Sequence, residues 1–186
     1  MLSDMTTMNR WIALFRGINV GGKNLLPMAT LSRYLETIQL TNIKTYIQSG
    51  NVVFDSKSKS SKSIQKAIIE TIDKEHSFSL QLLLLRQGEL QMAINRNPYP
   101  DAVSEPQTLH LFFLESPPAK PNVKALDLAK SSTESYELID RVFYLHAPDG
   151  VGRSKLAATA EKHLGVMATA RNYRTVEKLM ELASEA

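Results

Sequence analysis

Two pairs of β-rich runs, each joined by a short polar turn, constrain the fold of this chain more than any other feature. The first pair covers residues 43–48 and 52–55 around Ser49-Gly50-Asn51, and the second covers 136–139 and 142–145 around Asp140-Arg141. Short turns of Gly, Asn or Asp between such runs are typical of β-hairpins. Helical patterns and further apolar runs flank each pair. The sequence therefore predicts hairpins interleaved with helices.

The order of the apolar periodicities predicts the fold class. The first half reads β-α-β-β-α-β, which is the split βαβ, or ferredoxin-like, arrangement. The second half reads β-α-β-β-α and then a final helix, 173–183, in place of a last strand. We therefore predict an α+β fold of two consecutive ferredoxin-like subdomains, the second ending in an extra C-terminal helix. The predicted subdomains are residues 9–97 and 107–186, separated by a proline-rich linker at 98–106.

Composition narrows the class of protein. The 186 residues are 43% hydrophobic and 22% charged, as in an ordinary globular protein. The formal net charge of +3 permits a phosphate or nucleic-acid partner without requiring one. The chain has no cysteine, which excludes disulfides and thiolate metal sites and fits a reducing cytoplasm. No apolar run approaches the ~18 residues of a membrane span, so we predict a cytoplasmic protein without a membrane partner.

A glycine-rich stretch at residues 16–24, RGINVGGKN, is the main candidate for a binding site. Its glycines allow a tight turn and a close approach to a ligand. Backbone N–H groups near a helix start, beside a lysine, suit an anion. The spacing fits the first seven positions of a phosphate-binding P-loop, but the eighth, a Ser or Thr in that motif, is Asn24. The hairpin topology also differs from the parallel sheet of P-loop NTPases. We predict a looser anion site, with a purely structural turn as the alternative.

Other loops are predicted to contribute to this site. We expect the loop before the first helix and the lysine-bearing loop 56–63 to lie at the same end of the first sheet. Residues 149–155, DGVGRSK, are also glycine-rich and basic at a helix start, and residues 169–174, TARNYR, lie between two predicted helices. The predicted ligand-binding residues are Arg16, Asn19, Gly21, Gly22, Lys23, Asn24, Gln48, Ser49, Asn51, Arg153, Lys155, Arg171, Asn172 and Arg174.

Each of these predictions has a structural alternative. Arg16 at a strand end could pair with a carboxylate, and the turn at 48–51 is good hairpin chemistry without any ligand. Asn172 suits a helix N-cap, and Arg171 and Arg174 could form a solvated basic edge. Modules that recognise RNA share the predicted topology, but they stack bases on exposed aromatic residues. Residues 50–54 echo that pattern only faintly.

Catalysis has little support in the sequence. The histidines, at positions 76, 110, 146 and 163, lack metal-ligand spacing, so we predict no metal site and no cofactor. Asp55 ends an apolar strand, where it could act as a base or simply cap the next turn. No nucleophile stands out, although a triad can assemble in space from distant residues.

Four motifs together resemble a known family. They are WIALFRGINVGGKN, TYIQSGNVVF, GRSKL and LGVMATARNYRTVEKL, and they follow one another from about Asn9 to the C-terminus. The chain resembles the uncharacterised bacterial family called domain of unknown function 1697. The resemblance implies an α+β fold of two somewhat ferredoxin-like subdomains. It implies no activity and assigns no role to the motif residues.

Three hypotheses for the function remain open. The first is a module that binds a phosphate-bearing ligand, either a nucleotide or a nucleic acid. The second is an enzyme for a small anionic metabolite, with Arg16 and Lys23 as electrostatic stabilisers and Asp55 as the base. The third is a structural or protein-interaction domain whose polar motifs hold the fold together. The sequence does not predict an oligomeric state.

Overall fold

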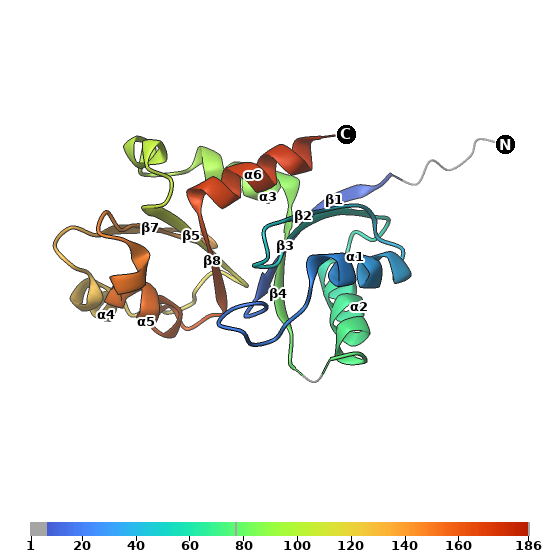
Figure 1. Ribbon diagram of the computed structural model, residues 1–186. Coiled ribbons are helices and arrows are strands. Elements are labelled where there is room, and N and C mark those ends of the chain that lie inside the picture. The colour runs from blue at the N-terminus through green and yellow to red at the C-terminus, as the bar shows by residue number, and fades with distance from the viewer. Residues whose placement is uncertain (1–6, 77, 186) are drawn as a thin grey trace. The chain divides into compact units, whose positions relative to one another are not determined.

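The chain forms a mixed α+β structure with two four-stranded antiparallel sheets (Figure 1). The computed structural model describes residues 7–76 and 78–185. The chain divides into two units. Unit 1 contains the described residues up to Leu90 and those from Lys178 onward, and unit 2 contains Gln91–Glu177.

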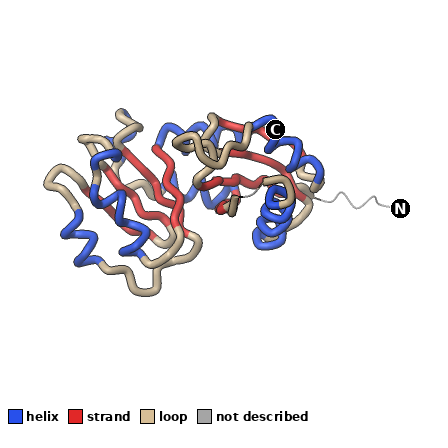
Figure 2. Tube along the Cα trace, turned by 60° about the horizontal axis from the view of Figure 1, so that its bottom comes forward, coloured by secondary structure: helices blue, strands red, loops and turns tan. Residues whose placement is uncertain are grey.

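Unit 1 is built around the first sheet, whose strand order is β2-β3-β1-β4. Strand β1 lies beside both β3 and β4 and runs antiparallel to each. Helices α1 and α2 lie on one face of this sheet (Figures 1 and 2). The elements are β1 (Asn9–Arg16), α1 (Met28–Thr37), β2 (Thr41–Tyr46), β3 (Asn51–Ser56), α2 (Ser61–Asp73), β4 (Gln81–Arg86) and the start of α3 (Gln87–Asn95).

Unit 2 repeats this arrangement with the strand order β6-β7-β5-β8. Helices α4 and α5 pack on one face of its sheet. The elements after α3 are a 3₁₀ helix (Pro100–Ser104), β5 (Leu109–Leu114), α4 (Val123–Ala129), β6 (Ser135–Ile139), β7 (Val142–His146), a second 3₁₀ helix (Val151–Arg153), α5 (Lys155–Leu164), β8 (Ala168–Asn172) and α6 (Tyr173–Ser184).

Each unit has its own apolar core between the sheet and its two helices. In unit 1, Trp11 and Phe15 of β1 pack with residues of α1 and α2 such as Leu31 and Ile68. The neighbouring β1 residues Ile12 and Leu14 point to the other face and are also fully buried. Strand β1 is therefore buried on both faces. In unit 2 the corresponding core joins the sheet to α4 and α5.

Two expectations from the sequence were wrong. Residues 168–172 form strand β8 instead of a link between helices, so the second sheet has its fourth strand before α6 begins. The sequence ATARN has a single β-branched residue, Thr169, and no large apolar residue, so it gives only a weak strand signal. The loops after β1 and β3 also lie at opposite ends of the first sheet, because β1 and β3 are antiparallel and Asn9 pairs with Ser56.

The predicted subdomain boundaries, 9–97 and 107–186, stay predictions. The predicted linker contains the 3₁₀ helix Pro100–Ser104. Helices α3 and α6 each continue through a boundary between the units.

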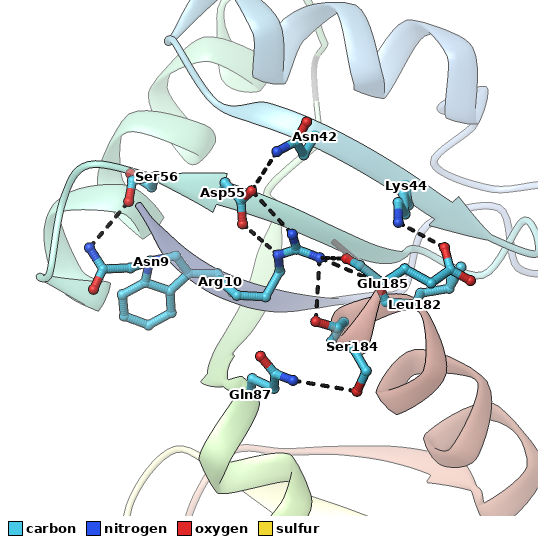
Figure 3. Close-up of polar contacts among 12 residues, drawn as sticks. Asn9, Arg10, Asn42, Lys44, Asp55, Ser56, Gln87, Leu182, Ser184 and Glu185 are labelled. Carbon is cyan, nitrogen blue, oxygen red and sulfur yellow. Dashed lines mark hydrogen bonds and ion pairs between the residues drawn. The ribbon is translucent and has the colours of Figure 1, made fainter. Parts of the chain in front are cut away.

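Arg10 connects the first and last parts of unit 1 (Figure 3). Its guanidinium binds Asp55 on β3, and its Nη1 also donates to the backbone oxygens of Leu182, Ala183 and Glu185 at the end of α6. The last carbonyls of a helix have no partner within the helix and attract cations. One side chain therefore satisfies the end of α6 and neutralises Asp55.

Candidate functional site

The glycine loop of unit 1 ends in a tight, exposed turn. Val20 and Lys23 form an isolated β-bridge, and the Lys23 amide donates to the Val20 carbonyl at 3.1 Å. Gly21 and Gly22 between them have φ angles of +58° and +73°. Two successive residues with positive φ define the type I′ turn, which glycine adopts without strain. An added Cβ at either glycine would meet no atom within 4 Å, so the turn has open space around it.

The side chain of Asn19 stabilises the conformation of this loop through hydrogen bonds to backbone groups. Its side-chain Nδ2 donates to the carbonyls of Leu26 and Gln48, both at 2.8 Å, and its Oδ1 accepts from the Leu26 amide at 2.7 Å. Asn24 donates its side-chain amide to the Gly17 carbonyl at 2.9 Å. Because these side chains already bond the loop's own backbone and its neighbour, their role in the described structure is to fix the loop.

The β2–β3 turn is the partner of the glycine loop. Gln48 is exposed and supplies the carbonyl that Asn19 reaches. Asn51 is fully buried and donates to the Tyr46 carbonyl at 3.2 Å and to the Ser49 hydroxyl at 3.1 Å. Arg16 is half-buried at the end of β1, where it pairs with Gln81 in the sheet register. Exposed Gly21, Gly22 and Lys23 are therefore the members of this group best placed to meet a ligand.

Asp55 and the lysine-bearing loop are remote from the glycine loop. Asp55 pairs with Arg10 in the register of β1 and β3, whereas Arg16 is six residues further along β1. At about 3.3 Å per residue this separation is about 20 Å. Asp55 accepts from Arg10 and from the Asn42 side chain at 2.7 Å. The arrangement in which Arg16, Lys23 and Asp55 share one catalytic pocket is therefore not formed.

The second glycine-rich loop, in unit 2, lines a hollow of about 240 Å³. The hollow lies where the connection between α4 and β6 meets the connection between β7 and α5. Arg153 and Lys155 are both exposed on its wall, at the start of α5. The lining residues are Ala129, Ser131, Glu134, Ala147, Asp149, Gly150, Arg153, Ser154 and Lys155.

The start of α5 follows from its sequence. Gly150 has a φ of +93°, which turns the chain after β7. Ser154 is buried and caps the helix, since its hydroxyl accepts from the Ala157 amide at 2.9 Å. Gly165 ends the helix in the left-handed conformation. The helix therefore presents its positive end, with two cationic side chains, to the hollow.

Two carboxylates in the hollow were missed by the sequence analysis. Glu134 is buried, and its Oε2 accepts from the Ser131 amide at 2.9 Å. Asp149 is exposed and accepts from the Thr133 hydroxyl at 2.6 Å. Asp149 belongs to the glycine-rich stretch 149–155, whereas Glu134 comes from a separate loop and is marked by no local pattern.

The remaining predicted residues lie on or next to β8 and do not line this hollow. Arg171 donates to the Thr169 hydroxyl at 3.0 Å and to the Ala170 carbonyl at 2.8 Å, and burial lowers its pKa to about 10. Asn172 caps α6 by accepting from the Thr175 amide at 2.9 Å, as the sequence predicted. Arg174 is exposed in the first turn of α6. Because Arg171 is in a strand, it does not share a helical face with Arg174.

Outside these loops, the described residues offer few further candidates for a site. In the part of the chain that the structure describes, no cluster of three or more His, Asp or Glu side chains could hold a metal ion. Within residues 7–76 and 78–185, none of the helices combines the length and apolar character needed to cross a bilayer. His110 on β5 is the exception among buried polar groups, since its Nδ1 has no hydrogen-bond partner among the described residues.

These features define an α+β protein with two four-stranded antiparallel sheets, each backed by two helices. The chain belongs to the family described as protein of unknown function (DUF1697), whose family model matches residues 8–144. The resemblance stated from the sequence motifs is thereby confirmed. The first two motifs lie within the matched range, and the last two lie beyond it.

The fold is also similar to a solved structure, that of a conserved bacterial protein from Streptococcus pneumoniae. The two chains are 21% identical and superpose with a TM-score of 0.74 over 96% of this chain and 100% of the other. At this identity the likeness concerns the fold alone. No curated protein matches the chain.

Proposed function

We propose that the protein binds a small phosphate-bearing ligand, with a nucleotide as the leading class, in the hollow of unit 2. The observation that carries the proposal is the meeting of Arg153, Lys155 and the capped start of α5 on one concave wall. The first amides of a helix and the helix dipole both favour an anion there. Arginine and lysine add charge-assisted hydrogen bonds to phosphate oxygens.

The carboxylates narrow the ligand class. Glu134 and Asp149 balance the charges of Arg153 and Lys155, so the hollow has no excess positive charge for a bare anion. A ligand that carries both an anionic group and hydrogen-bond donors matches this lining. Its anionic group would meet Arg153 and Lys155, and its donors would meet Glu134 and Asp149. The amino groups of a nucleobase are such donors, and Glu134 and Asp149 can accept from them. The volume of about 240 Å³ is below the usual range for drug-sized ligands and suits a mononucleotide or smaller molecule.

The glycine loop of unit 1 supports a second anion contact. Gly21, Gly22 and Lys23 are exposed at its tip, and the open space around the glycines would admit a phosphate. This contact is secondary because the loop tip is a convex turn, whereas the wall at α5 is concave. Binding to nucleic acid is the alternative for the same chemistry, and it would use phosphates spaced along a strand.

Calorimetry at low salt tests the proposal. The titrants are AMP, ATP, inorganic phosphate and adenosine, and the variants are Arg153→Ala and Lys155→Ala. Lys162→Ala is the matched control, since Lys162 is exposed in the last turn of the same helix. Loss of a charged hydrogen bond of about 1.5–3 kcal/mol would weaken nucleotide binding roughly ten-fold or more. We expect this loss for the first two variants and wild-type affinity for the control. Absence of heat with every titrant would contradict the proposal.

We further propose that each unit has a ferredoxin-like fold and that the protein is cytoplasmic. The strand orders β2-β3-β1-β4 and β6-β7-β5-β8 support a ferredoxin-like assignment for each unit, because the split βαβ arrangement interleaves its strands in this way. The proposed location is the cytoplasm, because a chain without cysteine fits a reducing compartment and nucleotides are abundant there.

A further inference from the structure

Unit 1 exposes three aliphatic side chains on two adjoining loops. Val20 and Leu25 of the glycine loop are 61% and 64% exposed, and Ile47 of the β2–β3 turn is 52% exposed. Single exposed apolar residues are common and need no explanation. A group of them on one surface is less common and usually marks an interaction site.

Hydrogen bonds of Asn19 join the two loops at residues next to these three. Val20 follows Asn19 directly, Leu25 precedes Leu26, and Ile47 precedes Gln48. The Asn19 side chain bonds Leu26 through both its oxygen and its nitrogen, and it bonds the Gln48 carbonyl at 2.8 Å. Each aliphatic residue is therefore one residue, about 3.8 Å of chain, from a residue of this network. We call Val20, Leu25 and Ile47 the Asn19 patch.

The backbone conformation of Ile47 is unfavourable for an isoleucine. Ile47 has a φ of +49°, in the left-handed region that glycine and asparagine tolerate and β-branched residues avoid. An asparagine at this position would relieve the conflict and replace an exposed apolar surface. Strained residues of this kind tend to occur where they serve binding. The local fold alone gives no reason for isoleucine here.

The charges around the patch indicate the chemistry of its partner. The two loops, residues 16–27 and 46–50, contain Arg16 and Lys23 and no Asp or Glu. A second copy of the same surface would bring these cations face to face. The apolar side chains are aliphatic, whereas proteins that bind single-stranded nucleic acid stack bases on aromatic rings. A partner with acidic groups beside apolar side chains would complement both the positive charge and the aliphatic surface of these loops.

We infer that the Asn19 patch is a docking surface for a partner protein segment that presents apolar side chains flanked by Asp or Glu. The segment would cover the three aliphatic side chains, and its carboxylates would meet Lys23 at the rim. This surface is in unit 1 and does not depend on the nucleotide proposal for unit 2.

A phage-displayed library of random 12-residue peptides, selected against the full chain, tests this inference. Clones are counter-selected against the triple variant Val20→Ser/Leu25→Ser/Ile47→Asn. Enriched peptides are then synthesised and measured by fluorescence anisotropy. We expect Leu, Ile or Phe beside Asp or Glu in the enriched peptides. We expect at least ten-fold weaker binding to Ile47→Asn and weaker binding at high salt.

Two controls separate binding from folding. Leu128→Ser removes an aliphatic side chain that is 76% exposed on α4 of unit 2, and it should leave peptide binding unchanged. Ile47→Asn should raise the melting temperature of unit 1, followed through the fluorescence of Trp11, the single tryptophan. Lost binding in a more stable variant is then not a loss of fold.

Several outcomes would overturn the inference. They are a failure to enrich any peptide over the triple variant, peptides without acidic residues, and binding that survives Ile47→Asn. Two further measurements address other occupants of the patch. Binding to vesicles of phosphatidylcholine and phosphatidylserine that the triple variant loses would assign the surface to lipid. A dimer that dissociates in the triple variant would assign it to a second copy of the chain.

Discussion

The Nε atom of Arg10 lies 2.5 Å from the Oδ1 atom of Asp55, in an ion pair that is mostly shielded from water (Figure 3). The two side chains are 16% and 8% exposed. The Arg10 Nη2 atom also reaches the second oxygen of Asp55 at 3.2 Å, which makes the contact bidentate. The same guanidinium donates to the final carbonyls of α6. The last turn of the chain is therefore bound to the first strand of unit 1 through one cation.

Breaking this ion pair should destabilise unit 1 strongly. Removal of one member of a buried pair leaves the other charge without compensation, which typically costs about 3–5 kcal/mol. We expect Arg10→Ala to approach that loss in the free energy of unfolding, measured by urea unfolding with Trp11 fluorescence as the probe. Arg10→Lys should recover only part of it, because an ammonium lacks the planar fork of the guanidinium.

An exposed ion pair in the same unit provides the control. Lys66 and Glu70 lie one helical turn apart on α2 at 3.7 Å, and their side chains are 75% and 59% exposed. Lys66→Ala should change the free energy of unfolding by no more than about 0.5 kcal/mol. Equal effects for Arg10→Ala and Lys66→Ala would contradict the role assigned to Arg10.

Substitution of Gly50 should damage the junction between the glycine loop and the β2–β3 turn. Gly50 has a φ of +77°, and an added Cβ would lie 2.5 Å from the Phe15 Cβ and 2.8 Å from the Ile18 Cδ1. Left-handed backbone strain and overpacking together predict a loss of about 2–5 kcal/mol for Gly50→Ala. Urea unfolding followed by Trp11 fluorescence measures this loss.

Gly88 is the matched control for this substitution. It lies in helix α3 of unit 1, and an added Cβ there would meet no atom within 4 Å. Gly88→Ala should be neutral or should stabilise the protein by about 0.5–1 kcal/mol, because glycine is a poor helix former. If Gly50→Ala were as stable as the wild type, the close approach of Phe15 and Gly50 would be refuted.

The buried hydroxyl of Tyr144 on β7 gives a prediction with two readouts. The Tyr144 hydroxyl donates to the Ala93 carbonyl at 2.8 Å, and burial raises the Tyr144 pKa to about 12. Tyr144→Phe should lower the free energy of unfolding by about 1 kcal/mol, and more if the carbonyl stays unsatisfied. In an ultraviolet pH titration the variant should lack one phenol that ionises with a midpoint near pH 12. An unchanged late phase would contradict the burial of this hydroxyl.

How much the sequence could predict depends on how local each feature is. Ser154 and Asn172 act on amides three residues away, so their capping roles can be read from neighbouring residues. Strand β8 was missed because ATARN has no large apolar residue, and its place in the sheet comes from pairing with β5, far earlier in the chain. Glu134 joins Asp149 and Arg153 in the hollow only when two separate loops meet, and nothing in the local pattern predicts that meeting.

One error could have been avoided by following the direction of the chain. Helix α1 returns the chain so that β1 and β2 run parallel, and the hairpin then reverses β3. The loop after β1 must therefore adjoin the β2–β3 turn and lie away from the loop after β3. The hydrogen bond from Asn19 to the Gln48 carbonyl is the direct consequence. The lysines of residues 57–62 could not have reached the glycine loop.

The buried histidine of unit 2 should make stability depend on pH. Burial lowers the pKa of His110 below its usual value of 6.5, and a hydrogen bond with the Thr108 backbone offsets this only in part. Its Nδ1 atom is buried and has no hydrogen-bond partner among the described residues. The folded state therefore prefers neutral His110, and the unfolded chain binds the proton more tightly. Stability should be complete above about pH 6.5 and should fall as the pH drops below it, by at most about 1.4 kcal/mol per pH unit.

Comparison with His110→Leu isolates this effect from the other titrating groups. Leucine is apolar, is similar in size to histidine, and cannot be protonated. We expect the difference in unfolding free energy between wild type and variant to shift in favour of the variant as the pH falls from 7.5 to 5. Urea unfolding followed by circular dichroism measures it, and Trp11 fluorescence recorded in parallel separates unit 1 from unit 2. If the two proteins lost stability in parallel over this pH range, His110 would not be the buried neutral group that the structure describes.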